Sequence, residues 1–162
     1  MPVKIRTAAS ADLPFIVDLE RAAETAAHWR EEEYRELFDK PATLVQRLVL
    51  IAEEEKGSSR ALPNPSSSPL GFLVARHVAS EWELENIVVA PSVRRMGVGR
   101  QLMGALVTWA IQTESHSILL EVRESNVAAR RLYEQLEFQE TGRRKSYYAN
   151  PLEGAILYTR TL

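Results

Sequence analysis

The sequence predicts a single α/β domain, with helices packed on a mixed sheet, over residues 1–162. The length of 162 residues falls within the usual range of single domains, about 100–200 residues, so a second independent domain is not expected. Short apolar runs bounded by turn residues alternate along the chain with segments that place apolar residues at helical spacing. No internal repeat is visible. The alternation therefore indicates one sheet with helices against it.

The first half of the chain has clear start and stop signals. Ser10 is expected to cap the first helix, and Asp12 falls in its first turn. The Ser- and Pro-rich segment 57–69 is expected to be a flexible hairpin loop, and an interdomain linker is the alternative. The elements expected around these signals are a strand at 3–8, a helix at 10–26, a helix at 30–40 and a strand around the apolar run LVLIA at 48–52.

The second half continues the same alternation. Pro91 ends a strand, because proline removes a donor from the ladder. The segment SYYANP, beginning at Ser146, is expected to be a loop before the last strand. The elements expected are strands at 71–78 and 82–91, a helix at 97–113, a strand at 117–124, a helix at 126–138 and a final strand that ends the chain.

Composition excludes several kinds of site. The chain has no cysteine, which rules out disulfides, thiolate metal ligands and a cysteine nucleophile. His28, His77 and His116 stand far apart, so no metal site is expected. A net charge of -2 gives no reason to expect nucleic acid as a partner. Since the N-terminus lacks a signal peptide and no apolar run reaches about 20 residues, we expect no membrane contact and a cytoplasmic protein.

The stretch RRMGVGRQL, residues 94–102, predicts an anion site. Gly97 and Gly99 lie between a strand and an amphipathic helix, where small residues let backbone amides approach a ligand and the helix N-terminus presents free N–H groups. The surrounding arginines add charged donors, which suits a diphosphate. The stretch lacks the Gly-Lys-Ser/Thr ending of a Walker loop and the third glycine of a dinucleotide fingerprint. A helix start with solvated arginines remains the alternative.

The spacing Arg94-x-x-Gly97-x-Gly99 resembles the acetyl-coenzyme A signature of the GCN5-related N-acetyltransferases. Two more stretches resemble that family in the same order: IRTAASADLPFIVDLE, its first strand and helix, and LEVRESNVAARRLYEQLEF, its fifth strand and next helix. The resemblance thus covers nearly the whole chain. It implies acetyl-coenzyme A as co-substrate, no metal, and a mostly antiparallel sheet that splays between its fourth and fifth strands.

The resemblance also implies which residues hold the coenzyme. The fourth strand carries no reactive side chains there, so its free backbone groups would bind the pantetheine arm and the thioester oxyanion. Asn126 would hydrogen-bond the coenzyme, although it can also be a simple N-cap. The implied coenzyme-binding residues are Ile87, Val88, Val89, Arg94, Arg95, Met96, Gly97, Val98, Gly99, Arg100 and Asn126.

Two residues are expected to carry the chemistry. Glu121 lies in the apolar run ILLEV, where partial burial raises a carboxylate's pKa toward that of a useful general base. Tyr133, in the following helix, has a phenol that can protonate a leaving thiolate. The resemblance assigns these roles to both residues. The alternatives are a carboxylate on the solvent face of the sheet and a tyrosine packed in the core.

The last third of the chain is similar to the bacterial ribosomal-protein-alanine N-acetyltransferases. That similarity implies a protein or peptide N-terminus as acceptor, with a ribosomal protein as the expected partner. Tyr147 and Tyr148 would form the acceptor groove, and strand-edge packing is the alternative for both. Trp29 would line the acceptor site from the first loop, and a satellite hydrophobic contact is equally consistent with its position.

The chain departs from the family pattern at two positions. Glu137 stands where the family has glycine after the helix, and Gly154 replaces an acid before the last strand. Without cysteine, direct transfer in a ternary complex is expected. Two alternatives stay open: acetylation of a small amine or a lysine side chain, and a coenzyme A-binding module without turnover. The sequence does not distinguish a monomer from a homodimer.

Overall fold

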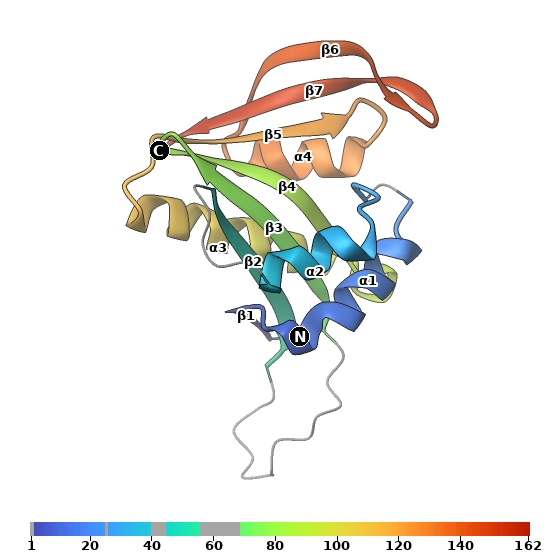
Figure 1. Cartoon of the computed structure of the whole chain (residues 1–162). Coiled ribbons are helices and arrows are strands. Elements are labelled where there is room, and N and C mark those ends of the chain that lie inside the picture. The colour runs from blue at the N-terminus through green and yellow to red at the C-terminus, as the bar shows by residue number, and fades with distance from the viewer. Residues whose placement is uncertain (1, 25, 40–44, 56–68) are drawn as a thin grey trace.

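The computed structural model describes residues 2–24, 26–39, 45–55 and 69–162 and contains one seven-stranded mixed sheet (Figure 1). The strands follow one another across the sheet in the order β1-β2-β3-β4-β5-β7-β6. The strands are β1 (Val3–Thr7), β2 (Gln46–Glu54), β3 (Gly71–Val78), β4 (Glu81–Val89), β5 (Ser117–Arg123), β6 (Gln139–Ala149) and β7 (Leu152–Thr161); the helices are α1 (Leu13–Ala22), α2 (Glu31–Asp39), α3 (Val98–Gln112) and α4 (Val127–Gln135).

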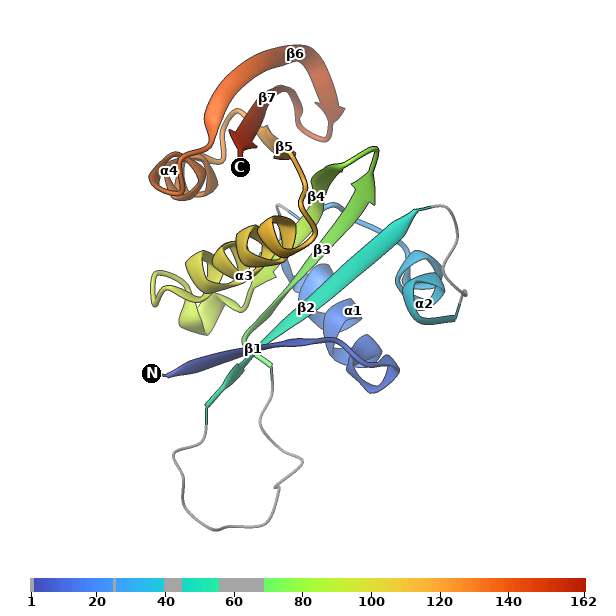
Figure 2. The ribbon, with the colours of Figure 1, turned by 90° about the vertical axis from the view of Figure 1, so that its left-hand side faces the viewer.

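Helices cover both faces of the sheet, which explains the continuous apolar runs of its central strands. Leu48 and Leu50 of β2 belong to the core that includes α3. Val49 and Ile51, the alternate residues of the same strand, belong to a second core with α1 and α2. The two helical layers are visible on opposite sides of β1–β4 in Figure 2. The expected α/β domain is confirmed.

The sheet opens between β4 and β5, as the resemblance implied. These strands run parallel, and their pairing extends only over Glu81–Leu84 and Ser117–Leu120. Beyond those residues the strands diverge (Figure 1). Both strands are described completely, and the C-terminal part of β4, from Glu85 on, has no pairing with β5. This strand edge therefore keeps backbone N–H and C=O groups for another partner.

The expectation of a loop at SYYANP was wrong, because residues up to Ala149 belong to β6. This edge strand has mostly exposed residues on both faces, so it lacks the apolar alternation that predicts a strand. Two irregularities interrupt its pairing with β7, one between Glu140 and Gly142 and one between Arg144 and Tyr148. Next to the second irregularity, Tyr147 and Tyr148 both face the gap between β4 and β5.

The expectation for Ser10 was also wrong. Ser10 lies in a short 3-10 turn, and Asp12 occupies the N-cap position of α1. The Asp12 carboxylate accepts the backbone N–H of Ala9 at 2.8 Å and two bonds from Arg6 at 2.7 and 2.8 Å. These contacts hold the pKa of Asp12 below its ordinary value, mainly through Arg6. The segment 57–69 lies outside the described residues except for Pro69.

Glu137 does adopt the left-handed conformation that the family's glycine would take, with φ at 65°. Phe138 N–H donates to the Tyr133 carbonyl and Glu137 N–H donates to the Glu134 carbonyl, as in a Schellman motif. Arg160 compensates by donating to the Leu136 carbonyl at 2.8 Å and to the Glu137 carboxylate at 2.9 Å. α4 therefore ends in a common helix C-terminal motif, with Glu137 in place of the usual glycine.

Among the described residues, no helix is long and apolar enough to cross a membrane.

Candidate functional site

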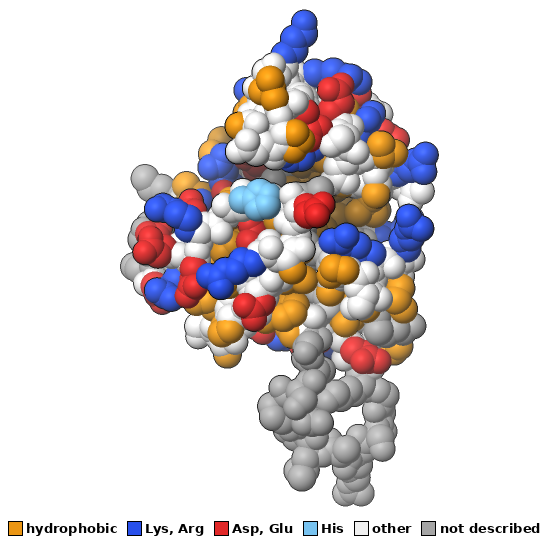
Figure 3. Space-filling model, turned by 90° about the vertical axis from the view of Figure 1, so that its right-hand side faces the viewer, with side chains coloured by type: hydrophobic (Ala, Val, Ile, Leu, Met, Phe, Trp, Pro, Cys, Tyr) orange, Lys and Arg blue, Asp and Glu red, His pale blue; other side chains and the backbone are white. Residues whose placement is uncertain are grey.

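The gap between β4 and β5 contains a cavity of about 370 Å³. Figure 3 shows the face of the molecule toward which the gap opens, where basic, acidic and apolar side chains lie near one another. Residues from widely separated segments of the sequence meet in the cavity. The cavity is lined by Ala26, Ala27, Trp29, Arg76, Glu83, Leu84, Glu85, Asn86, Ile87, Glu121, Val122, Arg123, Asn126, Ala129, Tyr133, Tyr147 and Tyr148.

The loop after β4, where the sequence predicts an anion site, lies outside the residues that line this cavity. Gly97 is the N-cap of α3 and has a φ of 84°, which glycine adopts without strain. No side chain caps the helix, so its first N–H groups remain available to an anion. Arg94, Arg95, Met96 and Arg100 are exposed around it. The arginines can therefore reach a diphosphate from the solvent side.

Gly99 lies where a side chain would crowd two neighbouring elements. A Cβ built on Gly99 would lie 3.3 Å from Leu132 of α4 and 3.7 Å from Val89 of β4. The glycine thus lets α3 pack closely between these two elements. Arg94 donates through Nε to the Val89 carbonyl at 3.3 Å, which links the loop to the end of the open strand. Gly97 and Gly99 therefore set the shape of the loop, Gly97 through its positive φ and Gly99 through close packing.

The open part of β4 presents its residues in alternation. Ile87 lines the cavity, whereas Val88 is buried in the core with α1 and α2. Glu85 is an extra residue in β4 where the register with β3 shifts between Val74 and Ala75. Such a bulge bends the strand, which helps it diverge from β5. From Ile87 on, the strand offers backbone groups and no ionisable side chain to the cavity, whereas Glu85 and Asn86 line the cavity with polar side chains.

Glu121 projects from β5 into the cavity with a side chain that is 25% exposed. Its Oε1 accepts a hydrogen bond from Arg144 Nε at 2.9 Å. The Glu121 carboxylate also lies close to the hydroxyl of Tyr147, and it is the main reason that the pKa of Tyr147 is raised. The Glu121 carboxylate is therefore fixed by Arg144 at the solvent edge of the gap and is not freely solvated.

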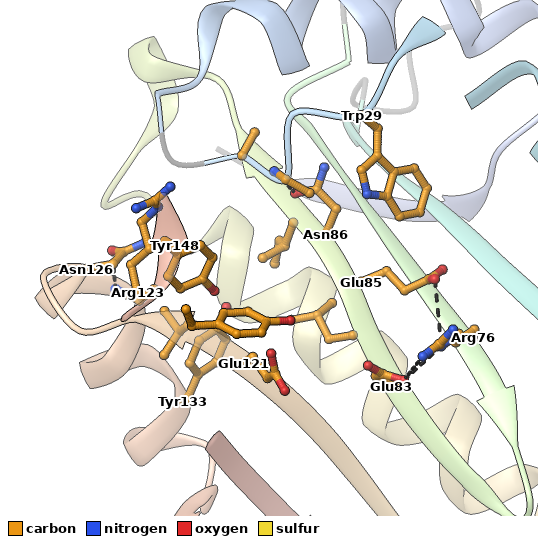
Figure 4. Close-up of a pocket in the computed structure, with 17 residues that line it drawn as sticks. Trp29, Arg76, Glu83, Glu85, Asn86, Glu121, Arg123, Asn126, Tyr133 and Tyr148 are labelled. Carbon is orange, nitrogen blue, oxygen red and sulfur yellow. Dashed lines mark hydrogen bonds and ion pairs between the residues drawn. The ribbon is translucent and has the colours of Figure 1, made fainter. Parts of the chain in front are cut away.

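Tyr133 lies on the same side of the gap as Glu121, on the face of α4 that lines the cavity (Figure 4). Its side chain is 3% exposed, and burial raises the pKa of its phenol above the ordinary value. Within the described part of the chain, the hydroxyl has no hydrogen-bond partner. A neutral O–H donor therefore borders the cavity.

Asn126 is the N-cap of α4, as one of its two expected roles required. Its Oδ1 accepts the backbone N–H of Ala129 at 3.2 Å. The residue also lines the cavity, so its amide N–H groups can face a ligand while the oxygen caps the helix. The two roles are compatible.

The two tyrosines of β6 close one side of the cavity. Their rings pack edge to face with centroids 5.1 Å apart. The guanidinium of Arg123 lies 4.2 Å from the Tyr148 ring centroid. Burial and the nearby Glu121 charge raise the pKa of Tyr148 to about 12. Figure 4 shows Trp29 across the gap from Tyr148 and Glu121, so the predicted acceptor residues form opposite walls.

Several site residues were missed from the sequence. Arg123 was detectable, since it lies two residues after Glu121 and shares its strand face. Glu20 was detectable too, because it lies four residues after Ile16 on the buried side of α1. No sequence pattern indicated Arg144, because the spacing of residues that share a strand face is not regular in an irregular edge strand. Asn86 and Arg76 also line the cavity without belonging to any expected motif.

Comparison with known proteins agrees with this geometry. A protein of Salmonella typhimurium named [Ribosomal protein bS18]-alanine N-acetyltransferase is 32% identical over 148 residues, which are 90% of this chain and 88% of that protein. The enzyme of the same name from Haemophilus influenzae is 39% identical over 85 residues, or 52% of this chain and 58% of that protein. The chain therefore spans little more than half the length of that relative.

Solved structures share the whole fold. The ribosomal-protein-S18-alanine N-acetyltransferase of Escherichia coli matches with a TM-score of 0.76 and 26% identity, covering 99% of this chain and 94% of that one. Arabidopsis thaliana NAA60 in complex with acetyl-CoA matches with a TM-score of 0.81 at 16% identity, covering 99% of both chains. The sequence profile described as "Acetyltransferase (GNAT) family" matches residues 13–138. With an open β4 edge, an uncapped helix N-terminus and this profile, the chain belongs to the acetyltransferase (GNAT) family.

Proposed function

We propose that the chain transfers acetyl directly from acetyl-CoA to the α-amino group of a protein N-terminus, with an alanine of a ribosomal protein as the acceptor. The observation that carries the proposal is the single cavity in which Glu121, Tyr133 and the open edge of β4 meet. The nearly full-length relative named for this activity supports the acceptor class. A ribosomal acceptor would place the reaction in the cytoplasm.

The residues of the loop and of β4 fit the coenzyme. The uncapped N–H groups of α3, with Arg94, Arg95 and Arg100 around them, would hold its diphosphate. The free backbone groups of β4 near Ile87 would hold the pantetheine arm and stabilise the oxyanion as the amine attacks. Asn126 would donate to the same ligand from the start of α4.

Glu121 and Tyr133 would move the protons. Glu121 accepts the proton that the attacking amine loses, directly or through water, as a new C–N bond forms. The C–S bond of the thioester then breaks, and Tyr133 donates its phenolic proton to the departing thiolate. The raised pKa of Tyr133 keeps the phenol protonated until the thiolate leaves, and it also makes the phenol a weaker acid than an ordinary tyrosine. Tyr147, Tyr148 and Trp29 would orient the acceptor chain.

The proposal is tested by following thiol release from acetyl-CoA with three acceptors. The first is a peptide with a free N-terminal alanine, the second is the same peptide with a blocked N-terminus and an internal lysine, and the third is a small amine. We expect turnover with the first only, and a mass shift confined to its N-terminal residue.

Two other outcomes would contradict it in different ways. Faster turnover with the lysine peptide or the small amine would assign the chain to another acceptor class within the family. Tight acetyl-CoA binding without thiol release from any of the three would indicate a coenzyme-sensing module.

A further inference from the structure

A buried polar cluster lies behind the acceptor wall of the cavity, and the proposed chemistry does not use it. Its members are Glu20 of α1, Tyr34 of α2 and Asn86 of β4. Their side chains are almost completely removed from solvent: Glu20 is 3%, Tyr34 0% and Asn86 7% exposed. A carboxylate this deeply buried is costly unless its hydrogen bonds are satisfied.

The hydrogen bonds of the cluster have a fixed polarity. Glu20 Oε2 accepts from the Tyr34 hydroxyl and from Asn86 Nδ2, both at 2.8 Å. Asn86 Nδ2 also donates to the Tyr34 oxygen at 2.6 Å. Each donor therefore meets an acceptor, and the carboxylate is satisfied by neutral donors alone. Exchanging Glu20 for Gln or Asn86 for Asp therefore places a donor against a donor or an acceptor against an acceptor.

The same cluster holds the segment between α1 and α2 that lines the cavity. Glu20 Oε1 accepts the backbone N–H of Trp29 at 2.9 Å, and Asn86 Oδ1 accepts that of Ala27 at 3.4 Å. The Tyr34 ring packs against the Trp29 ring with centroids 5.2 Å apart. Trp29 is thus held by its backbone and by its ring. Ala27, Trp29 and Asn86 all line the cavity.

We infer that Glu20 and Asn86 are positioning residues that set the acceptor wall of the cavity by holding Ala27 and Trp29 in place. The inference rests on the proposed function, since it assigns this wall to the acceptor. The cluster acts through the side chains of Glu20, Tyr34 and Asn86, so its loss leaves in place the backbone groups of β4 and the helix N-terminus that would bind the coenzyme. Its loss should therefore weaken acceptor use and leave acetyl-CoA use nearly unchanged.

Glu20→Gln tests the inference with a change of almost no volume. A glutamine at this position has one oxygen and one NH₂ group. Whichever way it turns, a donor faces either Trp29 N–H or Asn86 Nδ2. Because an unsatisfied buried donor is costly, we expect the KM for the alanine peptide to rise about 10-fold. Asn86→Asp, which places a second carboxylate against Glu20, should raise it at least as much.

The double variant Glu20→Gln/Asn86→Asp provides a rescue. The new glutamine donates where the carboxylate of Glu20 accepted, and the new aspartate accepts where the amide of Asn86 donated. Tyr34 reverses its two hydrogen bonds by rotating its hydroxyl. The backbone N–H groups of Ala27 and Trp29 still meet oxygens. We expect the acceptor KM of this variant to return to within about 3-fold of the original protein, since its donors and acceptors match again.

Trp82→Phe serves as a matched control, because it removes a buried hydrogen bond, Nε1 to Thr113 Oγ1 at 3.1 Å, from the other core. It should lower stability without a selective rise in acceptor KM. The inference is overturned if the single variants leave acceptor KM unchanged, if they raise the acceptor and acetyl-CoA KM equally, or if the double variant is worse than both. Failure of the unmodified protein to use any N-terminal peptide would overturn the proposed function, and this inference with it.

Discussion

The two sides of the cavity are built in different ways. The side proposed for the coenzyme consists of backbone groups: the open edge of β4 in the cavity and, beyond it, the first turn of α3 behind Gly97. The side proposed for the acceptor consists of side chains from the segment between α1 and α2 and from β3, β4, β5 and β6, held by ion pairs and hydrogen bonds. A backbone site tolerates most substitutions but depends on a few glycines, whereas a side-chain site can change its specificity through many single residues.

Tyr133→Phe is expected to have the largest effect among tests of this comparison. Tyr133 is the one side chain that we expect to donate a proton to the leaving thiolate, so removing its hydroxyl should lower kcat by about 100-fold. Acetyl-CoA binding should barely change, because the backbone groups remain. Steady-state kinetics and equilibrium binding measure the two quantities.

Tyr158→Phe is the control for this variant. Tyr158 lies in the same aromatic cluster, with its ring centroid 6.1 Å from that of Tyr133, and its hydroxyl donates to Glu134. The Tyr158→Phe substitution should lower the free energy of unfolding and leave kcat unchanged. Equal losses of kcat in both variants would show that packing, and not proton donation, explains the result.

The pH dependence of kcat gives a related test. Since burial raises the pKa of Tyr133 above its ordinary value near 10, the phenol stays protonated and active through neutral and mildly alkaline pH. Deprotonation of Tyr133 should therefore cause no fall of kcat below about pH 10. Any fall of kcat below that pH should persist in Tyr133→Phe. A fall near pH 8 that this variant removes would contradict the assignment.

Gly97→Ala should show that the coenzyme side depends on backbone conformation. The φ of 84° strains any residue with a Cβ by about 1–2 kcal/mol, although no atom lies within 4 Å of the added carbon. We expect acetyl-CoA KM to rise about 10-fold as the helix start shifts, with acceptor KM unchanged. Gly104→Ala, in open space within α3, is the control and should add about 0.5–1 kcal/mol of stability.

Gly154→Asp should affect the acceptor side instead. A Cβ there would lie 3.0 Å from the Arg144 carbonyl and 3.2 Å from the Glu124 carboxylate. We expect a loss of about 1 kcal/mol in unfolding free energy and a rise of a few fold in acceptor KM, because Arg144 must move with its strand. Gly142→Asp, whose nearest contact is 3.8 Å away, controls for the new charge. An unchanged acceptor KM in Gly154→Asp would show that this position does not influence the acceptor side of the cavity.

Glu137→Gly should have the smallest effect and should leave both sides of the cavity unchanged. It relieves the positive φ of 65° and loses only an exposed ion pair with Arg160. Urea unfolding should show a gain of about 0.5 kcal/mol after the added freedom of the unfolded chain is counted. A clear loss of stability would show that the Arg160 contacts outweigh the backbone strain.

The difference between the backbone-built and the side-chain-built sides of the cavity also explains which features could be predicted from the sequence. The loop at Gly97 and β4 are contiguous, so a short motif predicted the helix start, and the family resemblance that it carries implied the open strand. Glu121 and Tyr133 were placed together because they lie on adjacent elements. The acceptor side combines residues such as Glu20, Asn86 and Arg144, which are brought together only by the sheet. β6 was missed because an exposed, irregular edge strand has no periodic pattern.

The most direct test of the central claim is thiol release by Glu121→Gln with the alanine peptide, together with acetyl-CoA binding. Glutamine keeps the size of the side chain but cannot accept the amine's proton. The account predicts a fall in kcat/KM of at least about 100-fold with an unchanged dissociation constant for acetyl-CoA. A variant that keeps near-normal turnover would contradict the role of Glu121 as the base, and with it the assignment of this cavity as the place where both substrates react.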